Sequence, residues 1–444
     1  MNYYFVGIGG IGMSAIARFF KWRGDEVSGY DRTPSPLTAQ LEAEGIRVHY
    51  DDNEERVPKD VDMVVYTPAV PEDTRIMKYV RGLGVPVEKR SQMLGELTRG
   101  KKCIAVAGTH GKTTTSSMIA WLLHQSHIGC SAFLGGIAKN FKSNMVVNNE
   151  SEYVVVEADE YDRSFLQLYP YYSVITATDP DHLDIYGTHE NLIATFGQYA
   201  CQTKDEGGLL LKEGLKLNLR EGLICHNYSS KSKTADYYCE NVENEKGNIF
   251  FDLHTPKGML KRIELPNSCL FNAENAVAAS AVALKCGLSE EELRRGFLSF
   301  EGIKRRFDYR VKNDKIIYID DYAHHPAEIK ATLDSVRYMF PKAKVMGIFQ
   351  PHLYTRTRDF ADEFAKVLST LDQPVLLDIY PARELPIEGV TSKMLLDKID
   401  SKEKQLVKKE EVIETILKGA PDIVLTLGAG DIDRLVPKIE KALQ

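Results

Sequence analysis

The chain lacks the features that mark membrane and exported proteins. None of its uninterrupted apolar runs approaches the roughly 18 residues that a membrane-spanning helix needs. The first residues carry no basic segment ahead of an apolar core, so a signal peptide is not expected. We therefore predict a cytoplasmic protein with no membrane span.

Cysteine and positive charge are too sparse for several other classes. The seven cysteines include no Cys-x-x-Cys pair and their number is odd, which argues against a zinc knuckle and against a complete disulfide framework. Lys and Arg number 56 against 63 Asp and Glu, which gives a net charge of −7. Nucleic-acid-binding proteins are usually basic or carry a basic stripe, so we expect no nucleic-acid partner.

The composition that remains is that of an ordinary globular protein, with 43% hydrophobic and 27% charged residues. A length of 444 residues predicts about three domains. Changes in the pattern along the chain place these domains at residues 1–98, 99–305 and 306–444.

Strand and helix candidates alternate over most of the chain, which is typical of an α/β fold with parallel sheets. The first and last domains could each be a doubly wound sheet. The strand candidates are residues 3–6, 26–30, 61–66, 103–107, 153–156, 173–176, 315–319, 344–349, 375–379 and 422–427. The helix candidates are residues 13–22, 113–123, 272–285, 326–340 and 359–371. Residues 207–266 are rich in Gly, Asn, Lys and Ser and predict hairpins and loops.

The strongest local motif is Gly-Thr-His-Gly-Lys-Thr at residues 108–113, between a buried strand and a helix. Backbone N–H groups in such a turn, together with the N-terminus of the helix, bind phosphate oxygens. Lys112 is placed to reach the β- and γ-phosphates of ATP, and the Thr113 hydroxyl to hold Mg²⁺. Val106 stands where the common GxxxxGK[ST] pattern has its first glycine, so only the strand–turn–helix context is met. The alternative is a glycine turn that caps a helix with an exposed lysine.

Two further strand ends carry groups that bind cations. Glu157 follows the strand at 153–156, and His182 follows the strand at 173–176 among neighbouring carboxylates. Carboxylates at the carboxyl ends of parallel strands lie at the ligand edge of the sheet, and carboxylate oxygens suit Mg²⁺. Together with Lys112 they describe an ATP site with two metal ions. The alternatives are an acidic loop facing water and a histidine that only makes structural hydrogen bonds.

A second glycine motif, Gly-Ile-Gly-Gly-Ile-Gly at residues 7–12, also lies between a strand and a helix. Asp31 follows its last glycine by 19 residues, which is the spacing of a dinucleotide-binding fingerprint. The fingerprint indicates a pyrophosphate at a helix N-terminus and a ribose at an acidic side chain. Both NAD and a UDP-linked molecule meet that description.

The last domain has polar side chains at two successive strand ends. Residues 320–326 read Asp-Asp-Tyr-Ala-His-His-Pro, and residues 349–358 contain His352, Arg356 and Arg358. Arg binds carboxylates through two parallel hydrogen bonds, so these groups suit a small anionic substrate. The second segment could instead be the basic start of a helix, and Arg306 could either reach a γ-phosphate or solvate a linker.

Through these motifs the chain resembles the Mur ligase family over its whole length, and within it the alanine-adding branch. The segments that carry the resemblance are GIGGIGMS, AGTHGKTTT, EADE with SFL, DHLDIYG, FNAENAVAA, RRFD, DDYAHHPAE, FQPHLYTRTRD and LGAGDID. The short phosphate turn is the form that this family uses. Several sister ligases carry a carbamylated lysine soon after the metal-binding histidine, whereas here no lysine occurs between His182 and Lys204.

The resemblance implies a Rossmann-like N-terminal domain that binds a UDP-sugar, a central P-loop ATPase-like domain, and a Rossmann-like C-terminal ligase domain that binds the amino acid. It implies an ADP-forming, ATP-dependent ligase of peptidoglycan precursor synthesis. This enzyme would join L-alanine to the lactyl carboxylate of UDP-N-acetylmuramate through an acyl phosphate. Mg²⁺, at two sites, would be the cofactor, and the protein would be a monomer or a homodimer.

The resemblance also assigns residues. For ATP it gives Gly108, Thr109, His110, Gly111, Lys112, Thr113, Thr114, Asn272, Asn275, Arg306 and Asp321. For the UDP-sugar, the glycine motif and its context give Gly7, Gly9, Gly10, Gly12, Met13, Ser14 and Asp31. For alanine and the muramoyl carboxylate it gives Tyr322, His325, His352, Arg356 and Arg358. The metal ligands are Thr113, Glu157 and His182, and the groups expected to act in catalysis are Lys112, Glu157, His182, His325 and Arg356.

The alanine amine must be neutral to attack, so a base or a less polar pocket is needed, and His325 is our candidate for the base. Three other functions stay open at this point. One is a recycling ligase that attaches a tripeptide to the same nucleotide sugar. Another is an NAD-dependent dehydrogenase that uses residues 7–12, although it leaves residues 108–113 without a role. The third is a nucleotide-gated regulatory module without turnover.

Overall fold

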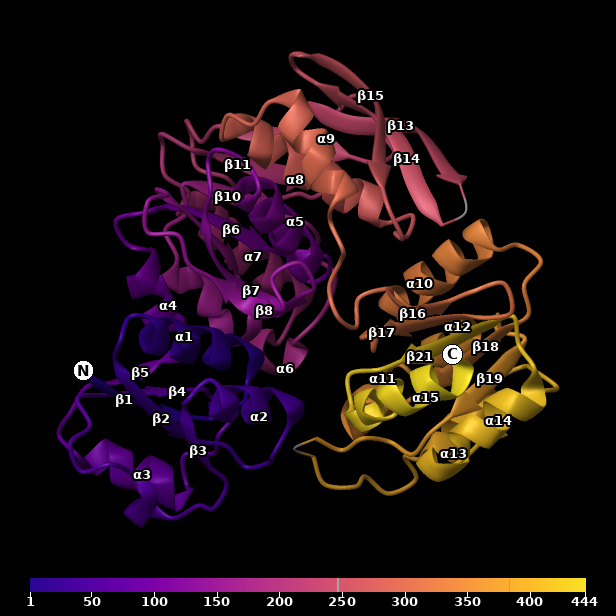
Figure 1. The fold of residues 1–444 in the computed structure, drawn as a ribbon, viewed down its shortest axis with the longest axis horizontal. Coiled ribbons are helices and arrows are strands. Elements are labelled where there is room, and N and C mark those ends of the chain that lie inside the picture. Colours follow the sequence, from indigo (N-terminus) through magenta and orange to yellow (C-terminus); the bar gives the residue numbers. More distant parts are fainter. Residues whose placement is uncertain (246, 383) are drawn as a thin grey trace. The chain divides into compact units, whose positions relative to one another are not determined.

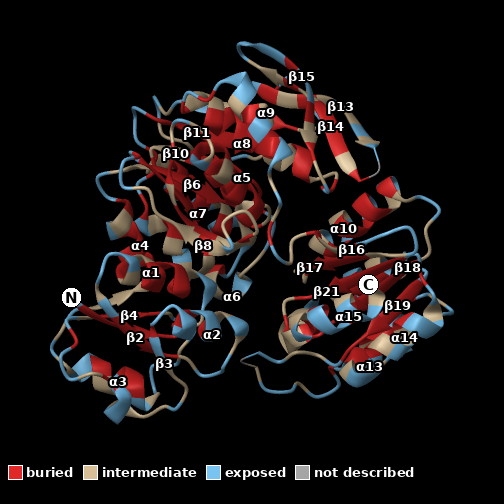
Figure 2. Ribbon diagram, in the orientation of Figure 1, coloured by how far each residue is buried: buried red, intermediate tan, exposed pale blue. Residues whose placement is uncertain are grey.

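The computed structural model describes residues 1–245, 247–382 and 384–444, which form three β-sheets with helices between most successive strands (Figure 1). The strands are largely buried, and the outward faces of many helices are exposed (Figure 2). The predicted α/β class is therefore confirmed. No helix within the described residues is long and apolar enough to cross a membrane.

The first sheet has five parallel strands in the order β3-β2-β1-β4-β5. Its middle strand β1 is buried at all five positions, because a parallel sheet is covered on both faces. The strand order reverses between β1 and β4, and ligands of such sheets bind at the carboxyl ends of the strands at that point. The elements of this part are β1 (Asn2–Val6), α1 (Ile11–Trp22), β2 (Glu26–Tyr30), α2 (Pro36–Ala43), β3 (Arg47–His49), β4 (Met63–Tyr66), α3 (Arg75–Gly82), β5 (Val87–Lys89) and α4 (Arg90–Thr98).

The second sheet has ten strands in the order β15-β14-β13-β12-β11-β10-β6-β9-β7-β8. β6 (Lys102–Ala107) pairs in parallel with β10 (Tyr172–Ile175) on one side and with β9 (Tyr153–Glu157) on the other. The three strand ends that carry the central motifs are therefore neighbours at one edge of the sheet.

The remaining elements of this part extend the sheet and surround it. Residues 207–266, predicted as hairpins and loops, form β11 to β15 and the turns between them. The elements are α5 (Lys112–His124), β7 (Ser131–Ala138), β8 (Ser143–Val146), η2 (Tyr161–Gln167), α6 (Leu183–Tyr186), α7 (His189–Cys201), β11 (Gly208–Lys212), β12 (Cys225–Ser229), β13 (Tyr237–Glu245), β14 (Asn248–Thr255), β15 (Gly258–Leu265), α8 (Asn272–Lys285) and α9 (Glu290–Leu298).

The first two sheets share one hydrophobic core. It runs from Phe5 and Ile16 in the first part to Phe133 and Val156 in the second, and the rings of Phe19 and Phe133 lie 5.6 Å apart. This continuity explains why the chain divides into two compact units rather than three. The first unit comprises residues 1–242, 251–264 and 274–301, and the second comprises residues 243–250, 265–273 and 302–444.

The third sheet has six strands in the order β16-β17-β21-β18-β19-β20, with β16 antiparallel at one edge. The helix predicted at 359–371 covers only Ala361–Leu368, and a short helix at Tyr354–Asp359 precedes it. The elements are β16 (Asp308–Lys312), β17 (Ile317–Asp321), α10 (Pro326–Met339), β18 (Val345–Phe349), α11 (Tyr354–Asp359), α12 (Ala361–Leu368), β19 (Gln373–Leu376), α13 (Ser392–Lys398), β20 (Gln405–Leu406), α14 (Val412–Gly419), β21 (Ile423–Leu427) and α15 (Val436–Leu443).

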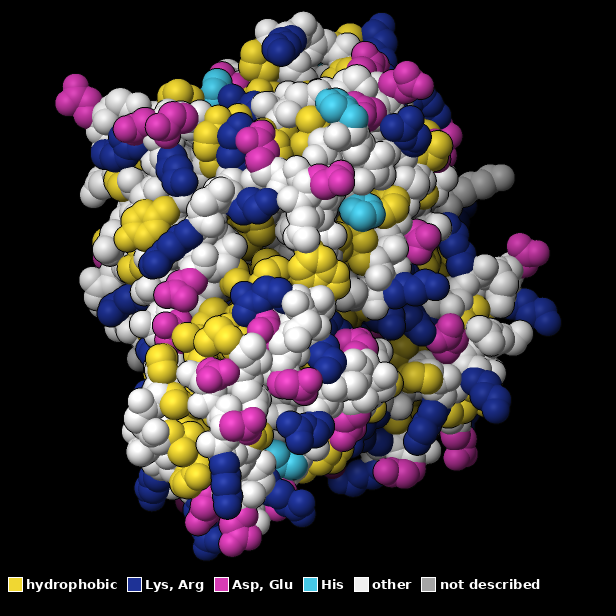
Figure 3. Space-filling model, turned by 60° about the vertical axis from the view of Figure 1, so that its left-hand side comes forward, with side chains coloured by type: hydrophobic (Ala, Val, Ile, Leu, Met, Phe, Trp, Pro, Cys, Tyr) yellow, Lys and Arg dark blue, Asp and Glu magenta, His cyan; other side chains and the backbone are white. Residues whose placement is uncertain are grey.

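Charged side chains of both signs are mixed on the molecular surface. On the face that Figure 3 draws, Lys and Arg lie among Asp and Glu. The near balance of acidic and basic residues in the sequence accounts for this mixture.

Candidate active site

The turn at residues 108–113 has a backbone that only glycine adopts freely at two positions. Gly108 has a φ of 133°, and Gly111, which caps α5, has a φ of 82°. A Cβ atom on Gly108 would lie 2.2 Å from Oγ1 of Thr176, just beyond the end of β10. The turn is thus packed against the neighbouring strand end, and it leads directly into the N-terminus of α5, where backbone N–H groups bind anions.

Lys112 begins α5, and its ammonium group is held inside the site. Nζ donates to the carbonyl oxygen of Gly108 (2.6 Å) and to Oε1 of Glu160 (2.9 Å). Burial raises the pKa of Glu160, although Lys112 opposes that rise. Burial would lower the pKa of Lys112, but the charges of Glu160 and of two nearby carboxylates raise it overall. Lys112 therefore remains a cation beside the phosphate turn.

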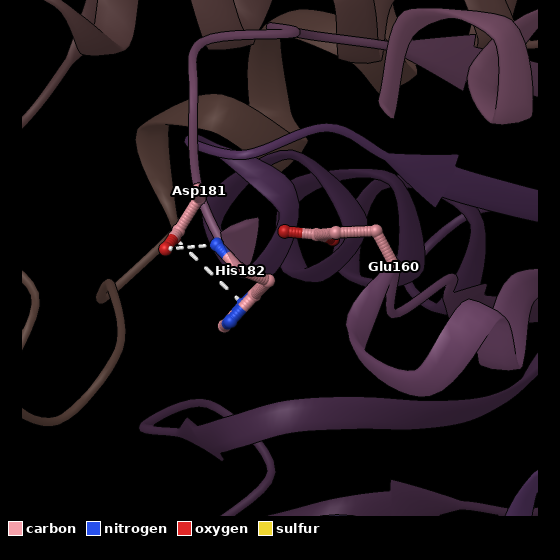
Figure 4. Close-up of side chains that lie close together, drawn as sticks. All are labelled: Glu160, Asp181 and His182. Carbon is pink, nitrogen blue, oxygen red and sulfur yellow. Dashed lines mark hydrogen bonds and ion pairs between the residues drawn. The ribbon is translucent and has the colours of Figure 1, made fainter. Parts of the chain in front are cut away.

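His182 lies in a group of three side chains whose possible metal-ligand atoms are close together. The ligand atoms of Glu160, Asp181 and His182 are all within 4.8 Å of one another. In Figure 4 the carboxylate of Glu160 points toward the other two side chains. His182 caps α6 with a φ of 51°, and its N–H donates to Oδ1 of Asp181 (2.8 Å). Carboxylate oxygens suit Mg²⁺, so this group fits a divalent cation.

Glu157 is outside that group, at the end of β9. Its carboxylate packs on Gly135 of β7, where a Cβ atom would come within 2.3 Å of both carboxylate oxygens. Oε2 of Glu157 is buried and makes no hydrogen bond to the parts of the chain that the structure describes. A buried carboxylate oxygen without a donor is costly, so this oxygen also fits a cation.

Asn275 connects α8 to the phosphate turn. Its Oδ1 accepts a hydrogen bond from Oγ1 of Thr115 (3.2 Å) and lies 3.0 Å from the position of a Cβ atom on Gly111. Asn272, the other predicted residue of this helix, is buried and donates to Oγ of Ser268 (3.1 Å). The structure therefore brings Asn275 to the turn.

Thr109 and His110 contact the segment that follows β10. The N–H of Asp179 donates to Oγ1 of Thr109 (3.1 Å), and a carboxylate oxygen of Asp179 lies 3.7 Å from Nε2 of His110. Thr113 and Thr114 are buried in the first turn of α5. Every predicted residue of the segment 108–114 is thus at or next to the turn.

The glycine turn after β1 is closed by Asp31. Oδ2 of Asp31 accepts a hydrogen bond from the N–H of Gly9 (2.8 Å), and Oδ1 accepts one from Thr33 (3.2 Å). Gly7, with a φ of 86°, donates to the carbonyl oxygen of Tyr30 (2.8 Å). A Cβ atom on Gly9 would lie 2.7 Å from Oδ2 of Asp31. Asp31 therefore shapes the turn, and its contact with a ribose stays a prediction.

The first turn of α1 has an open side and a buried side. Gly10 is exposed, whereas Met13 and Ser14 are buried. Oγ of Ser14 donates to the carbonyl oxygen of Ile11 (2.9 Å), and Nδ2 of Asn144 donates to Oγ of Ser14 (3.0 Å). In this structure Met13 and Ser14 support the helix from within, and their contact with the UDP-sugar also stays a prediction.

Two buried aspartates end β17. Asp321 accepts hydrogen bonds from the N–H groups of Phe307 and Ala323 and from Oγ1 of Thr332. Burial raises the pKa of Asp320 and of Asp321 to about 6 in each case. Asp321 therefore holds the surrounding segments together, and a contact with nucleotide remains a prediction.

Arg306 and Tyr322 lie together in the second unit. The guanidinium carbon of Arg306 lies 5.0 Å from the centre of the Tyr322 ring, and that of Arg305 lies 5.1 Å away. Nη2 of Arg305 donates to the carbonyl oxygen of Gly428 (2.5 Å). Arg305 is thereby fixed to the turn after β21, while about a third of the Arg306 side chain is exposed.

The histidines that follow β17 have different environments. His325 caps α10, where its Nδ1 accepts from the N–H of Ala327 (3.4 Å), so its neutral ring carries the proton on Nε2. Nδ1 of His324 lies 3.0 Å from the carbonyl oxygen of Tyr322 and must donate to it, which leaves Nε2 as an acceptor. His325 could serve as the amine base only by leaving its cap.

Arg356 lies close to His352, whereas Arg358 does not join them. Nη1 of Arg356 lies 3.4 Å from Nδ1 of His352, and the His352 ring lies 5.9 Å from that of His324. Nε of Arg358 donates to Asp359 (2.7 Å), and about half of the Arg358 side chain is exposed. Residues 354–358 open α11, and the binding of a substrate carboxylate by Arg356 and Arg358 stays a prediction.

His324 should stay neutral well below the usual range of histidine. Burial lowers its pKa to about 4, and Arg356 and Arg306 act in the same direction, against Glu328. Because the folded ring resists protonation, its contribution to stability is present above about pH 6.5 and is lost as the pH falls toward 4. We expect ¹⁵N-histidine spectra to show a neutral ring, protonated on Nδ1, down to about pH 5. The variant His324→Gln identifies the signal, and a transition near pH 6.5 would contradict this expectation.

Three polar residues that were not predicted as site residues lie close to predicted ones. Possible ligand atoms of Glu160 and Asp181 are within 4.8 Å of that of His182, and the His324 ring lies 5.9 Å from that of His352. In the sequence, Glu160, Asp181 and His324 each lie within three residues of a predicted site residue. A further polar side chain so close to a predicted one was the signal that could have identified them.

The order of β10, β6 and β9 places a cationic phosphate turn between strand ends that carry carboxylates and a histidine. That arrangement is typical of α/β domains that bind a nucleoside triphosphate with a metal ion. Two further α/β sheets are attached to this domain, each with polar groups at its strand ends. Fold and site together define a nucleotide-dependent enzyme of several α/β domains.

Comparison with family models makes the assignment specific. The Mur ligase family catalytic domain matches residues 2–102, the Mur ligase middle domain matches 106–283, and the Mur ligase glutamate ligase domain matches 305–430. The chain belongs to the Mur ligase family.

Individual relatives cover the whole chain. UDP-N-acetylmuramate–L-alanine ligase of Phocaeicola vulgatus is 50% identical over 98% of this chain and 96% of that protein. The enzyme of the same name from Porphyromonas gingivalis is 50% identical over 99% of this chain and 98% of that protein. The crystal structure of UDP-N-acetylmuramate–alanine ligase MurC from Thermotoga maritima superposes with a TM-score of 0.86 at 29% identity, covering 100% of this chain and 99% of that one. The expected three-domain architecture is thus confirmed.

Proposed function

We propose that this chain joins L-alanine to the lactyl carboxylate of UDP-N-acetylmuramate, in an ATP-dependent reaction of peptidoglycan precursor synthesis that forms ADP and phosphate. The observation that carries this proposal is the 50% identity, over nearly the whole chain, to relatives that bear this activity in their names. The phosphate turn with its buried lysine supports the ATP-dependent step.

The reaction needs ATP because a carboxylate does not acylate an amine. An oxygen of the lactyl carboxylate attacks the γ-phosphorus, the bond to the β-phosphate oxygen breaks, and ADP leaves. The neutral amine of alanine then attacks the carbonyl carbon of the acyl phosphate, the bond from that carbon to the phosphate oxygen breaks, and the amine gives up a proton. No protein nucleophile is required.

The residues of the central site have matching roles. Lys112 and the N-terminus of α5 bind the phosphates and offset the charge that develops on the transferred group. Mg²⁺ would be held by Glu157, Thr113 and His182, with Glu160 and Asp181 beside His182, and when bound it would neutralise phosphate charge. The buried Oε2 of Glu157 and the close spacing of Glu160, Asp181 and His182 support this assignment.

The second unit supplies the groups for the amino acid. Arg356 would bind the carboxylate of alanine or of the muramoyl group, with His352 and Tyr322 nearby. Either His324 through Nε2, or His325 after leaving its cap, would accept the amine proton. Asn272, Asn275, Arg306 and Asp321 would contact the nucleotide.

The proposal also includes a division of the chain into domains at residues 98 and 305. It further includes a cytoplasmic location and a monomeric or homodimeric state. The three successive family matches and the three sheets support the division. The glycine turn after β1 would bind the UDP-sugar through residues 7–14, with Asp31 at the ribose.

Phosphate release with each substrate left out in turn tests the reaction. We expect release only when ATP, UDP-N-acetylmuramate and L-alanine are all present, because the acyl phosphate accumulates on the enzyme without an amine. Release that does not require the UDP-sugar would count against the proposal. A tripeptide in place of alanine tests the recycling alternative, and we expect it to be a much poorer substrate.

A further inference from the structure

Arg90 occupies a position between two sites of the first unit. It begins α4, and its guanidinium lies against the first turn of α1, where a Cβ atom on Gly12 would be 2.9 Å from Nη1 of Arg90. On the other side, Nη2 of Arg90 donates to Oδ2 of Asp159 (3.0 Å). Asp159 stands between Glu157, the last residue of β9, and Glu160.

The segment after β9 has an unusual backbone and a second link, to the residue that precedes α4. Asp162 and Arg163 have φ values of 55° and 54°, a left-handed conformation that non-glycine residues seldom adopt. Nζ of Lys89, next to Arg90, donates to Oδ2 of Asp162 (2.9 Å). Two consecutive cations of the first domain therefore bind two carboxylates of the segment that pairs with Lys112.

The contact between α4 and this segment is tight. A Cβ atom on Gly95 of α4 would lie 2.6 Å from the carbonyl oxygen of Gln167 in η2. Arg90, Ser91 and Leu94 line a small cavity together with Glu157 and Asp159. Arg90 is thus hydrogen-bonded to Asp159 and lines the same small cavity as Glu157.

We propose that Arg90 binds the diphosphate of the UDP-sugar and, through Asp159, couples occupancy of the glycine turn to the ATP site. This inference rests on the proposed binding of the UDP-sugar at residues 7–14.

The geometry of the guanidinium supports a shared role. Arginine has five N–H donors in a fixed fork, and the hydrogen bond to Asp159 uses only one nitrogen. Nη1 lies over Gly12 in the first turn of α1, where the leading N–H groups of a helix have no partner within the helix and can bind a diphosphate. A bound diphosphate would compete with Asp159 for the guanidinium of Arg90 and so weaken the ion pair between these two side chains. The electrostatic environment of the nearby carboxylates of Glu157 and Glu160 would change as a result.

The first test compares ligands with and without the diphosphate. Calorimetric titration of Arg90→Met with UDP should show a dissociation constant about 10- to 100-fold higher than that of the native chain, because a charge-assisted hydrogen bond to phosphate is lost. Uridine, which has no phosphate, should bind both proteins equally. Arg99→Met is the matched control: it lies at the end of the same helix, is largely exposed, and should change neither titration. Arg90→Lys, which keeps the charge but not the fork, should give an intermediate loss.

The second test separates binding from support of the fold. In Arg90→Met the carboxylate of Asp159 loses its cation near the ATP phosphates, so a non-hydrolysable ATP analogue should bind several-fold more weakly. The double variant Arg90→Met/Asp159→Asn should recover the affinity for the analogue but not the affinity for UDP.

Three outcomes would overturn the inference: unchanged UDP binding in Arg90→Met, equal losses for UDP and uridine, or recovery of UDP binding in the double variant. If the native chain itself bound neither UDP nor UDP-N-acetylmuramate, the proposed function would fail first, and that result is distinct from the other three.

Discussion

Replacing Lys112 by methionine should reduce ATP-dependent product formation by on the order of 10³-fold, because Lys112 is the cation of the phosphate turn. Its ammonium is already positioned by the carbonyl oxygen of Gly108 and by Glu160, so no rearrangement is needed to meet the phosphates. Steady-state phosphate release and direct titration with an ATP analogue both measure the effect, and both should change.

Loss of Lys112 also leaves Glu160 buried without its cation, so the variant should be less stable. The double variant Lys112→Met/Glu160→Gln removes both charges and should recover thermal stability without recovering turnover. Lys393→Met is the matched control, since it removes an exposed lysine that pairs with Asp397 on α13. If the double variant regained activity, or if Lys112→Met retained it, the role assigned to the turn would be wrong.

The sequence predicts strands better than it predicts which side chains meet. β1, β6, β9 and β10 are short apolar runs, because each is buried in a parallel sheet, and all four lie where the sequence places them. The order β10-β6-β9 follows from pairings between distant segments, which local pattern does not contain. The prediction that the three strand ends carrying motifs lie together therefore rested on a general rule, that the carboxyl ends of parallel strands lie at the same edge of a sheet.

Residues 157–160 show more clearly that the sequence does not predict which side chains become partners. Glu157 and Glu160 are three residues apart, and either could be expected to face the lysine. In the structure Glu160 binds Lys112, and the neighbouring chain has a left-handed backbone at Asp162 and Arg163 and accepts hydrogen bonds from Lys89 and Arg90. The partners of these contacts are 73 and 69 positions apart in the sequence, so the local pattern of residues 157–160 does not assign Glu160 to Lys112.

The domain division illustrates a third limit. Pattern changes near residues 98 and 305 mark where one alternation of strands and helices ends and another begins. Whether two neighbouring domains share a core depends on side chains such as Phe19 and Phe133, which are 114 positions apart and meet only in the fold. The sequence shows that these residues are apolar, and the structure shows that they join the first two sheets into one compact unit.

Replacing Gly108 by alanine should lower turnover and ATP binding by about 100-fold or more, for a reason that differs from the loss of charge at Lys112. The new Cβ atom would lie 2.2 Å from Oγ1 of Thr176 and 2.7 Å from the backbone nitrogen of Ala177, and backbone cannot move aside cheaply. The turn would have to open, which displaces the N–H groups that bind phosphate, and such groups are each worth on the order of 10²-fold in rate.

A matched glycine separates this collision from backbone strain. Gly258, the first residue of β15, has a φ of 136°, nearly that of Gly108, but a Cβ atom there would meet nothing within 4 Å. Gly258→Ala should therefore carry a similar conformational cost and leave phosphate release unchanged. Thermal unfolding of both variants measures the shared strain, and ATP titration measures the part that belongs to the turn. Equal ATP affinities in the two variants would mean that Gly108 serves the backbone alone, and that the close approach of Thr176 does not shape the phosphate site.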